Sequence, residues 1–309
     1  MSIRVSAVVL LSGSLLAIAA SAPGETGQFA FAPPDSVSYQ VSAVTARSRT
    51  ADTAAAILDS ALLSGEGTLT RTASGWALRE KSAAISMKRD GETVDDPLLN
   101  ILVGLTVTTE IDSIGTAIRV EGYDAIIGRI DSSMSSDQAT MVKRLINPDA
   151  IAKRDLEEWN GRMLRLRGRS TAIGSVSYDT TTISFPNGTE ALAYCATQVK
   201  DTLRINGILC ARVAFTTDVR IGSLCQAIGV ELQDICREFE VSDSLPEMRN
   251  DSAAQMHANV ESVVEVATML FRSEISSRKI SFLMPDRSGT KVPMSMMETI
   301  RKAYLYAGR

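Results

Sequence analysis

The sequence is poor in the residues that most often bind metals or perform acid–base catalysis. It has one histidine, His257, and four cysteines in 309 residues. A structural zinc site needs about four clustered His or Cys ligands, and the cysteine spacings of 15, 15 and 11 residues match no zinc finger. A P-loop, a G-x-G-x-x-G turn, an H-E-x-x-H helix and a G-x-S-x-G elbow are also absent. We therefore expect no metal ligands, no cofactor and no catalytic residues.

Excess positive charge and long apolar segments are lacking as well. The 32 Lys and Arg against 36 Asp and Glu give a formal net charge of −4. Nucleic acids and anionic membrane surfaces attract basic proteins, so neither is expected as the main partner. Beyond the N-terminus no run reaches the roughly 18 apolar residues that a membrane-spanning helix needs. We expect no transmembrane segment in the mature chain.

The N-terminus has the three parts of a secretory signal peptide. Arg4 supplies a positive charge, residues 5–19 are apolar, and residues 20–22 read Ala-Ser-Ala, a small-x-small cleavage site. A membrane anchor is the alternative, but the apolar run is short and contains Ser and Gly. We predict that residues 1–22 are a signal peptide, that 23–35 form a flexible lead-in, and that the mature protein is periplasmic or extracellular.

Short alternating segments separated by turn residues predict antiparallel strands in the first part of the chain, residues 36–160. We expect a β-meander with covering helices there. Strands are predicted at 36–46, in a hairpin over 66–88, at 105–111 and at 116–123; helices are predicted at 50–63, at 97–104 and in three segments between 123 and 161.

The second part, residues 161–309, is again rich in strand patterns. Strands are predicted at 162–169 and 174–185, in a hairpin around Asn206-Gly207 and after residue 260, with a helix at 222–239 and an ambiguous segment at 293–307. This order predicts an α+β fold with an antiparallel, curved sheet or sheets and helices packed on one face. We expect the second part to be continuous with the first.

The helix predicted at 97–104 is apolar on nearly every side. Burial in the core is the ordinary explanation for such a helix. The alternative is a lipid-sized pocket under a curved sheet, since ligand pockets are mostly apolar. The residues expected to line that pocket are Leu98, Leu99, Ile101, Leu102, Ile126, Ile127 and Ile130.

Asn206-Gly207 predicts a tight turn between two strands and leaves two registers open. A two-residue turn places Asp201 opposite Arg212, which matches charges. A three-residue loop places Val199 opposite Val213, which matches apolar faces.

The cysteines are disulfide candidates, because an even number in an exported protein favours oxidation. Both registers keep Cys195 and Cys210 more than about 20 Å apart, too far for a bond. If the helix at 222–239 runs back over the hairpin, the first register allows Cys195–Cys225 and Cys210–Cys236.

Charged clusters offer two weaker candidate sites. Arg165, Arg167 and Arg169 share one face of the strand predicted at 162–169, where they form either an anion site or, as we favour, a solvent-facing stripe. The acidic pairs Asp95-Asp96 and Glu157-Glu158 are explained by helix capping and by a solvated face rather than by a catalytic pair.

The signal peptide, meander and covering helices, with the segment "LVGLTVTTEIDSIGTAIRVEGY" at 102–123, resemble periplasmic carriers of the LolA, LolB and LppX type and uncharacterised exported bacterial families. The resemblance covers roughly residues 36–200. It implies a curved sheet and helices that enclose acyl chains. The Pro-Gly-x-Phe-Arg-Trp stretch of the lipoprotein carrier is not found, and Trp76 lies in "GWALRE" instead.

Three functions follow as hypotheses. The first is an exported, non-enzymatic protein that binds an apolar ligand or lipid in a pocket between sheet and helix. The second is a cell-envelope module that binds another protein. The third is a hydrolase built on carboxylates, which a deep cleft with convergent Asp or Glu side chains would support.

Overall fold

The computed structural model describes residues 26–51, 54–89, 91–94, 97–184, 190–219, 255–285 and 291–307. The predicted signal peptide at 1–22 and the helix predicted at 222–239 lie outside the described residues. Within the described ranges, no helix is both long enough and apolar enough to span a membrane.

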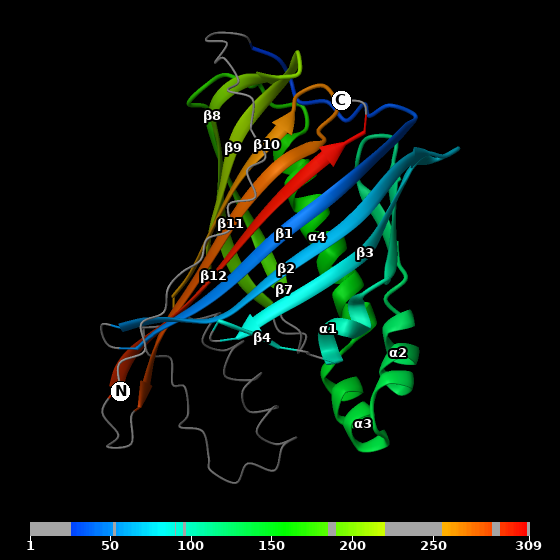
Figure 1. The fold of residues 1–309 in the computed structure, drawn as a ribbon. Helices are drawn as coiled ribbons and strands as arrows, with labels where there is room; N and C mark the ends of the chain where they lie inside the picture. Colours follow the sequence, from blue (N-terminus) through cyan, green and yellow to red (C-terminus); the bar gives the residue numbers. More distant parts are fainter. Residues whose placement is uncertain are drawn as a thin grey trace.

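The described chain forms one antiparallel sheet with few helices (Figure 1). The strands are β1 (Ser36–Ala51), β2 (Ala54–Arg71), β3 (Gly75–Arg89), β4 (Glu92–Val94), β5 (Thr106–Asp112), β6 (Ala117–Glu121), β7 (Val176–Ser184), β8 (Glu190–Ile205), β9 (Ile208–Val219), β10 (Gln255–Glu265), β11 (Phe271–Pro285) and β12 (Lys291–Tyr306). The helices are α1 (Pro97–Leu102), α2 (Ala125–Ser133), α3 (Ser136–Leu145) and α4 (Pro148–Leu166).

The strand order is β6-β5-β3-β2-β1-β12-β11-β10-β9-β8-β7, and β4 pairs with β3 beside this path. The predicted antiparallel sheet is therefore confirmed, but the fold is mainly β and not α+β. Pairing of β1 with β12 joins the first and second parts of the chain in one sheet.

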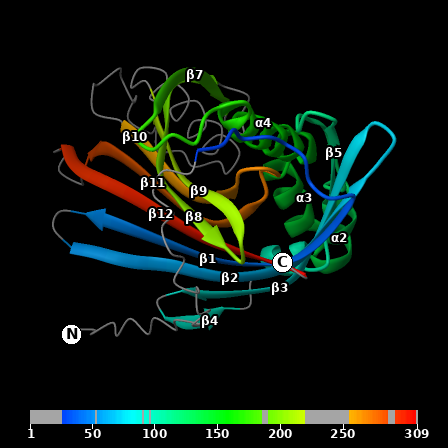
Figure 2. The ribbon, with the colours of Figure 1, turned by 90° about the horizontal axis from the view of Figure 1, so that it is seen from above.

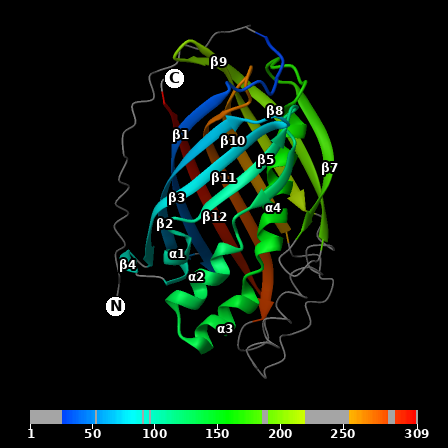
Figure 3. The same cartoon turned by 90° about the vertical axis from the view of Figure 1, so that its right-hand side faces the viewer.

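The sheet is curved, and α4 lies in the opening of the curve (Figure 2). Figure 3 shows α1, α2 and α3 gathered near one end of α4. Asn147 caps the start of α4 by accepting hydrogen bonds from the backbone of Asp149 and Ala150, and Pro148 takes the first turn. A capping Asn followed by Pro is a sequence signal for a helix start, and the structure has a helix start there.

The largest hydrophobic core lies between the concave face of the sheet and α4. It includes Leu69 and Leu78 from the strands and Met163 and Leu166 from the helix. Phe29, from the predicted flexible lead-in, is only 2% exposed in this core, and its backbone N–H donates to the carbonyl of Arg169. The described part of that lead-in is thus anchored to the sheet–helix core.

Two predicted elements are wrong. Residues 50–63 do not form a helix, because β2 is paired on both sides by β1 and β3, and this pairing overrides the helix propensity of alanine. Residues 162–166 are not a strand but the end of α4. There Met163 and Leu166 are buried with helical spacing, while Leu164 is 56% exposed.

The hairpin of β8 and β9 combines both predicted registers. Asn206 and Gly207 have φ values of 50° and 80°, as a tight turn of this type requires. A bulge between Val199 and Asp201 then shifts the pairing. Asp201 faces Arg212 on one side of this bulge, and Val199 faces Val213 on the other. The bulge therefore satisfies the charge match near the turn and the apolar match beyond it.

Candidate functional site

A cavity of about 230 Å³ lies between α4 and the concave face of the sheet. One wall is the side of α4 that carries Asp155, Glu158, Trp159, Arg162 and Met163. The other walls come from strands, from the β6–α2 connection and from the β10–β11 turn, through Tyr39, Leu69, Leu78, Glu80, Val107, Thr109, Tyr123, Met269, Leu270, Phe271, Lys302, Tyr304 and Tyr306.

Part of the lining is aromatic. The Tyr39 ring lies 5.7 Å from the ring of Tyr304 and 5.4 Å from that of Tyr306, measured between centroids. Its position depends on Gly67, the residue opposite it on β2. A Cβ atom at position 67 would lie 2.1 Å from Cζ of Tyr39, so only glycine leaves room for the ring.

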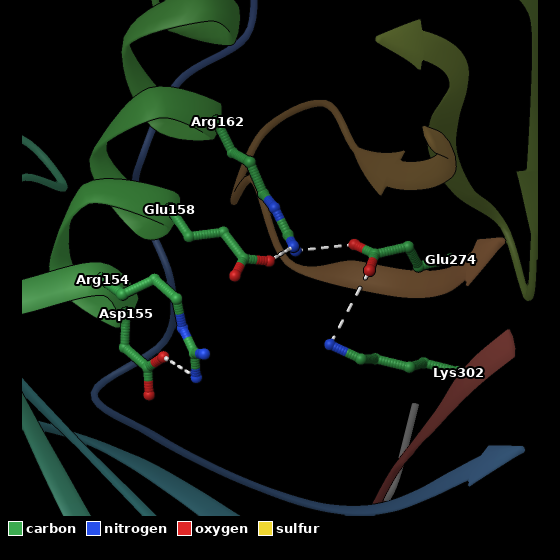
Figure 4. A network of polar contacts seen from close by, with 6 residues as sticks. All are labelled: Arg154, Asp155, Glu158, Arg162, Glu274 and Lys302. Atoms are coloured by element: carbon green, nitrogen blue, oxygen red, sulfur yellow. Dashed lines mark hydrogen bonds and ion pairs between the residues drawn. The ribbon is translucent and has the colours of Figure 1, made fainter. Parts of the chain in front are cut away.

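Charged side chains gather on the α4 side of the cavity (Figure 4). Arg162 contacts Glu158 one helical turn away and donates to Glu274 on β11 at 2.6 Å. Lys302 on β12 lies 3.7 Å from the other oxygen of Glu274. Glu274 is 2% exposed, so its charge is balanced inside the protein by two cations from different elements.

The charges in this network reinforce one another. Burial alone would raise the pKa of Glu158, but Arg162, Lys302 and Arg154 outweigh it and hold that pKa below its ordinary value. Burial likewise disfavours the charge of Arg162, yet Glu158 and Glu274 raise its pKa. Both side chains are therefore ionised at neutral pH.

Tyrosine hydroxyls complete the polar lining. The Tyr39 hydroxyl donates to Glu80 at 2.6 Å, and the Tyr123 hydroxyl donates to Asp155. Burial first, and then the neighbouring carboxylates, raise the pKa of Tyr39, Tyr123 and Tyr304 above the ordinary value. These hydroxyls stay protonated, and those of Tyr39 and Tyr123 act as hydrogen-bond donors.

The apolar residues predicted to line a pocket do not line this cavity. Ile101, Ile126 and Ile130 are buried in a separate cluster with Leu105 and Val142, and Leu102 and Ile127 pack against it. Leu99 is partly buried in α1, and the side chain of Leu98 lies outside the described residues. The apolar side chains of α1 therefore pack against α2 and α3 and form a small core with them.

The two described cysteines are buried and lie on different parts of the β8–β9 hairpin. Cys195 faces Thr217, and Cys210 faces Leu203. Their predicted partners, Cys225 and Cys236, lie outside the described residues, so the two disulfides remain predictions. Burial first, and then the charge of Glu265, raise the pKa of Cys210 to about 11.

The predicted arginine stripe is divided in the structure. Arg167 donates to the carbonyl of Ile114 and to the Thr116 hydroxyl at the β5–β6 turn. Arg165 and Arg169 instead line a hollow beside β7 and β8. Among the described residues, no group of three or more His, Cys, Asp or Glu side chains is placed to hold a metal ion.

The main site was missed because its residues come from many segments that lie far apart in the sequence. Two local signals were available in the sequence. Glu158 and Arg162 have the four-residue spacing of a helical ion pair, and Lys302, Tyr304 and Tyr306 alternate as one face of a strand. Neither signal indicates that the two faces meet.

Comparison with known protein families and with curated proteins gives no match for this chain. Among solved structures, it is similar to DynF from the dynemicin biosynthesis pathway of Micromonospora chersina, with 7% identity, 92% of this chain and 86% of that chain covered, and a TM-score of 0.20. OccK5 (OpdH) of Pseudomonas aeruginosa is 8% identical, with 88% of this chain and 98% of that chain covered and a TM-score of 0.20. OpdO of Pseudomonas aeruginosa is 10% identical, with 88% of this chain and 98% of that chain covered and a TM-score of 0.17. Likenesses this distant carry no argument about fold or function.

Proposed function

We propose that this protein is an exported, non-enzymatic binding protein that holds a small amphipathic molecule in the cavity between α4 and the sheet. The observation that carries the proposal is the mixed lining of the cavity. Leu69, Leu78, Met163, Met269 and Leu270 offer apolar surface, while charged side chains and tyrosine hydroxyls offer polar contacts. Pockets of mainly apolar lining with a few placed polar groups are typical of ligand sites.

The size of the cavity limits the ligand. About 230 Å³ is below the roughly 300–1,000 Å³ that drug-sized ligands occupy. A single short chain or a small ring system fits this volume better than several acyl chains. We include in this proposal the arrangement of LolA-type carriers, in which helices cover one face of a curved sheet and the ligand binds between them.

The charge of the lining favours a positively charged head group. The lining contains three carboxylates and two cations, namely Glu80, Asp155, Glu158, Arg162 and Lys302. Arg162 is bound between Glu158 and Glu274, whereas Glu80 is bound by a tyrosine hydroxyl and by no cation among the described residues. An ammonium group beside Glu80 would be balanced by that carboxylate and would contact the faces of the tyrosine rings.

The same contacts argue against carboxylate-based hydrolysis, although carboxylates converge on the cavity. Such chemistry needs one carboxyl group held protonated as an acid. Arg162 keeps the pKa of Glu158 low, and Arg162 and Lys302 both contact Glu274. These contacts stabilise carboxylates in their ionised state, which suits binding.

Three probes of equal, short chain length test the proposal: hexylamine, hexanol and hexanoate, titrated by calorimetry. We expect the amine to bind most tightly and the carboxylate most weakly. Glu80→Gln should weaken amine binding about tenfold and reduce the difference between amine and alcohol. Glu110→Gln, which removes a charge from the exposed face of β5, is the matched control and should bind as the native protein does. Absence of binding by all three probes would overturn the proposal.

A protein-binding role is favoured by one feature of the convex face. Val44 on β1 and Leu62 on β2 face each other across the strands, and both are about half exposed. Ile275 on β11 is similarly exposed. Val44→Ser with Leu62→Ser should abolish crosslinking to an envelope partner if this role holds. Unchanged crosslinking in that variant, together with probe binding by the native protein, would leave the cavity as the functional site.

A further inference from the structure

A second hollow lies between the end of α4 and the strands β7 and β8. Its volume is about 170 Å³, and it shares no lining residue with the main cavity. Its polar lining consists of Arg165, Arg169, Ser170, Ser175, Ser177 and Thr197, and its apolar lining of Phe29, Leu166, Val176 and Val199. We infer that this hollow binds a phosphate group, either as the free ion or as part of a phosphorylated molecule.

The two arginines lack carboxylate partners among the described residues. Arg165 donates to the sulfur of Cys195 at 2.9 Å, a weak acceptor that leaves its charge uncompensated. The Arg169 side chain makes no hydrogen bond or ion pair within the described part of the chain. Both are partly buried. In a protein of net charge −4, two cations that line one hollow and have no carboxylate partner in the described ranges indicate a site that an anion completes.

Hydroxyl groups provide further donors around the arginines. The Ser170 hydroxyl oxygen accepts from the backbone of Ala172 at 3.1 Å, so its O–H remains available. Ser175, Ser177 and Thr197 make no side-chain hydrogen bond within the described residues. A tetrahedral oxyanion has more acceptor positions than a planar carboxylate and can use both guanidinium groups and several hydroxyls together.

Two simpler explanations account for only part of this arrangement. A cation near the end of a helix is favoured by the helix dipole, which explains Arg165 in the last turn of α4. It does not explain Arg169, which lies after the helix, or the hydroxyls contributed by the facing strands. The apolar wall formed by Phe29, Leu166 and Val199 lowers the local dielectric and strengthens the attraction between arginine and anion.

The site is independent of the proposed amphiphile cavity, although both use α4. Arg162 lines the cavity, and Arg165, one turn further on, lines the hollow. Loss of phosphate binding therefore need not affect probe binding in the cavity, and the reverse also holds. The two proposals can fail separately.

The test is calorimetric titration of the full protein with inorganic phosphate and with glycerol 3-phosphate at low ionic strength. We expect Arg165→Gln and Arg169→Gln each to raise the dissociation constant at least about tenfold, as the loss of a charge-assisted hydrogen bond predicts. Arg301→Gln removes the same charge from an exposed position on β12 and should bind as the native protein does. Binding of the ester alone would identify a phosphorylated molecule, and binding of both would identify the phosphate group itself.

Arg169→Gln is the decisive variant, because the Arg169 side chain makes no hydrogen bond or ion pair within the described residues. Arg165→Gln loses the contact with Cys195, so its folding is checked by circular dichroism. Absence of binding by the native protein, or unchanged binding in Arg169→Gln, would overturn the inference.

Discussion

The side-chain amide of Asn160 pairs with both backbone groups of Ala117. Its Oδ1 accepts from the Ala117 N–H at 2.7 Å, and its Nδ2 donates to the Ala117 carbonyl at 2.9 Å. Ala117 begins β6, the edge strand of the sheet. Asn160 therefore takes the place of a neighbouring strand at this position, covers part of the edge and joins α4 to the sheet.

Asn160→Leu should destabilise the protein by about 1–3 kcal/mol, because two buried backbone groups lose their partner. Asn160→Asp should cost less, since it keeps the acceptor for the Ala117 N–H and loses only the donor. Urea unfolding measures both. Equal stability of the leucine variant and the native protein would show that the edge does not need this contact.

Breaking the buried ion pair of Arg162 and Glu274 should cost more. We expect Arg162→Met to lose about 3–5 kcal/mol, because buried Glu274 then has only the more distant Lys302 as a counter-charge. Adding Glu274→Met should recover part of that loss, since the buried carboxylate that lost its close partner is then removed. The exposed pair of Arg119 and Glu121 is the control, where Glu121→Gln should change stability by less than about 1 kcal/mol. A double variant less stable than Arg162→Met would contradict this account.

Gly67→Ala should move the Tyr39 ring and break its hydrogen bond to Glu80. Overpacking of this kind costs about 1–3 kcal/mol, and amine binding in the cavity should weaken as well. Gly128→Ala is the matched control on α2, where an added Cβ meets no atom within 4 Å. Thermal unfolding and probe titration compare the two variants, and equal behaviour would show that Tyr39 tolerates a side chain beneath it.

Cys210 should resist alkylation in the folded protein. Its raised pKa, about 11, keeps it a thiol at pH 8, and only the thiolate reacts. A variant that retains Cys210 alone excludes disulfide formation within the chain. Iodoacetamide should label this variant slowly in buffer and rapidly in urea. Fast labelling in buffer at pH 8 would mean that the site opens or that the thiolate is stabilised.

Local patterns were sufficient for features that depend on near neighbours. Asn147-Pro148 predicts the start of α4, and Asn206-Gly207 predicts the β8–β9 turn, because capping and turn geometry depend on adjacent residues. Alternation could not separate strand from helix at 162–166, where apolar positions fit both periods over so few residues. Met163 and Leu166, three residues apart, are both buried against the sheet, and this spacing fits a helix and not a strand.

The candidate site required information that no local pattern holds. Arg162 and Glu274 are 112 residues apart in sequence, and their contact depends on how α4 lies across the curved sheet. Glu158 was interpreted as a solvated helix position, and it does belong to a partly exposed surface. That this surface meets β11 and β12 depends on the strand order together with the position of α4 over the sheet.

The pairing of β1 with β12 has a consequence for the order of folding. Arg47 on β1 and Glu298 on β12 are hydrogen-bonded although they are 251 positions apart in the sequence. The centre of the sheet therefore cannot close until β12 has been synthesised, and β1 exposes an unpaired edge until then. Such distant pairing makes folding slow and leaves the nascent chain open to aggregation. We expect a chain lacking β12 to bind chaperones and to be degraded rather than to fold in part.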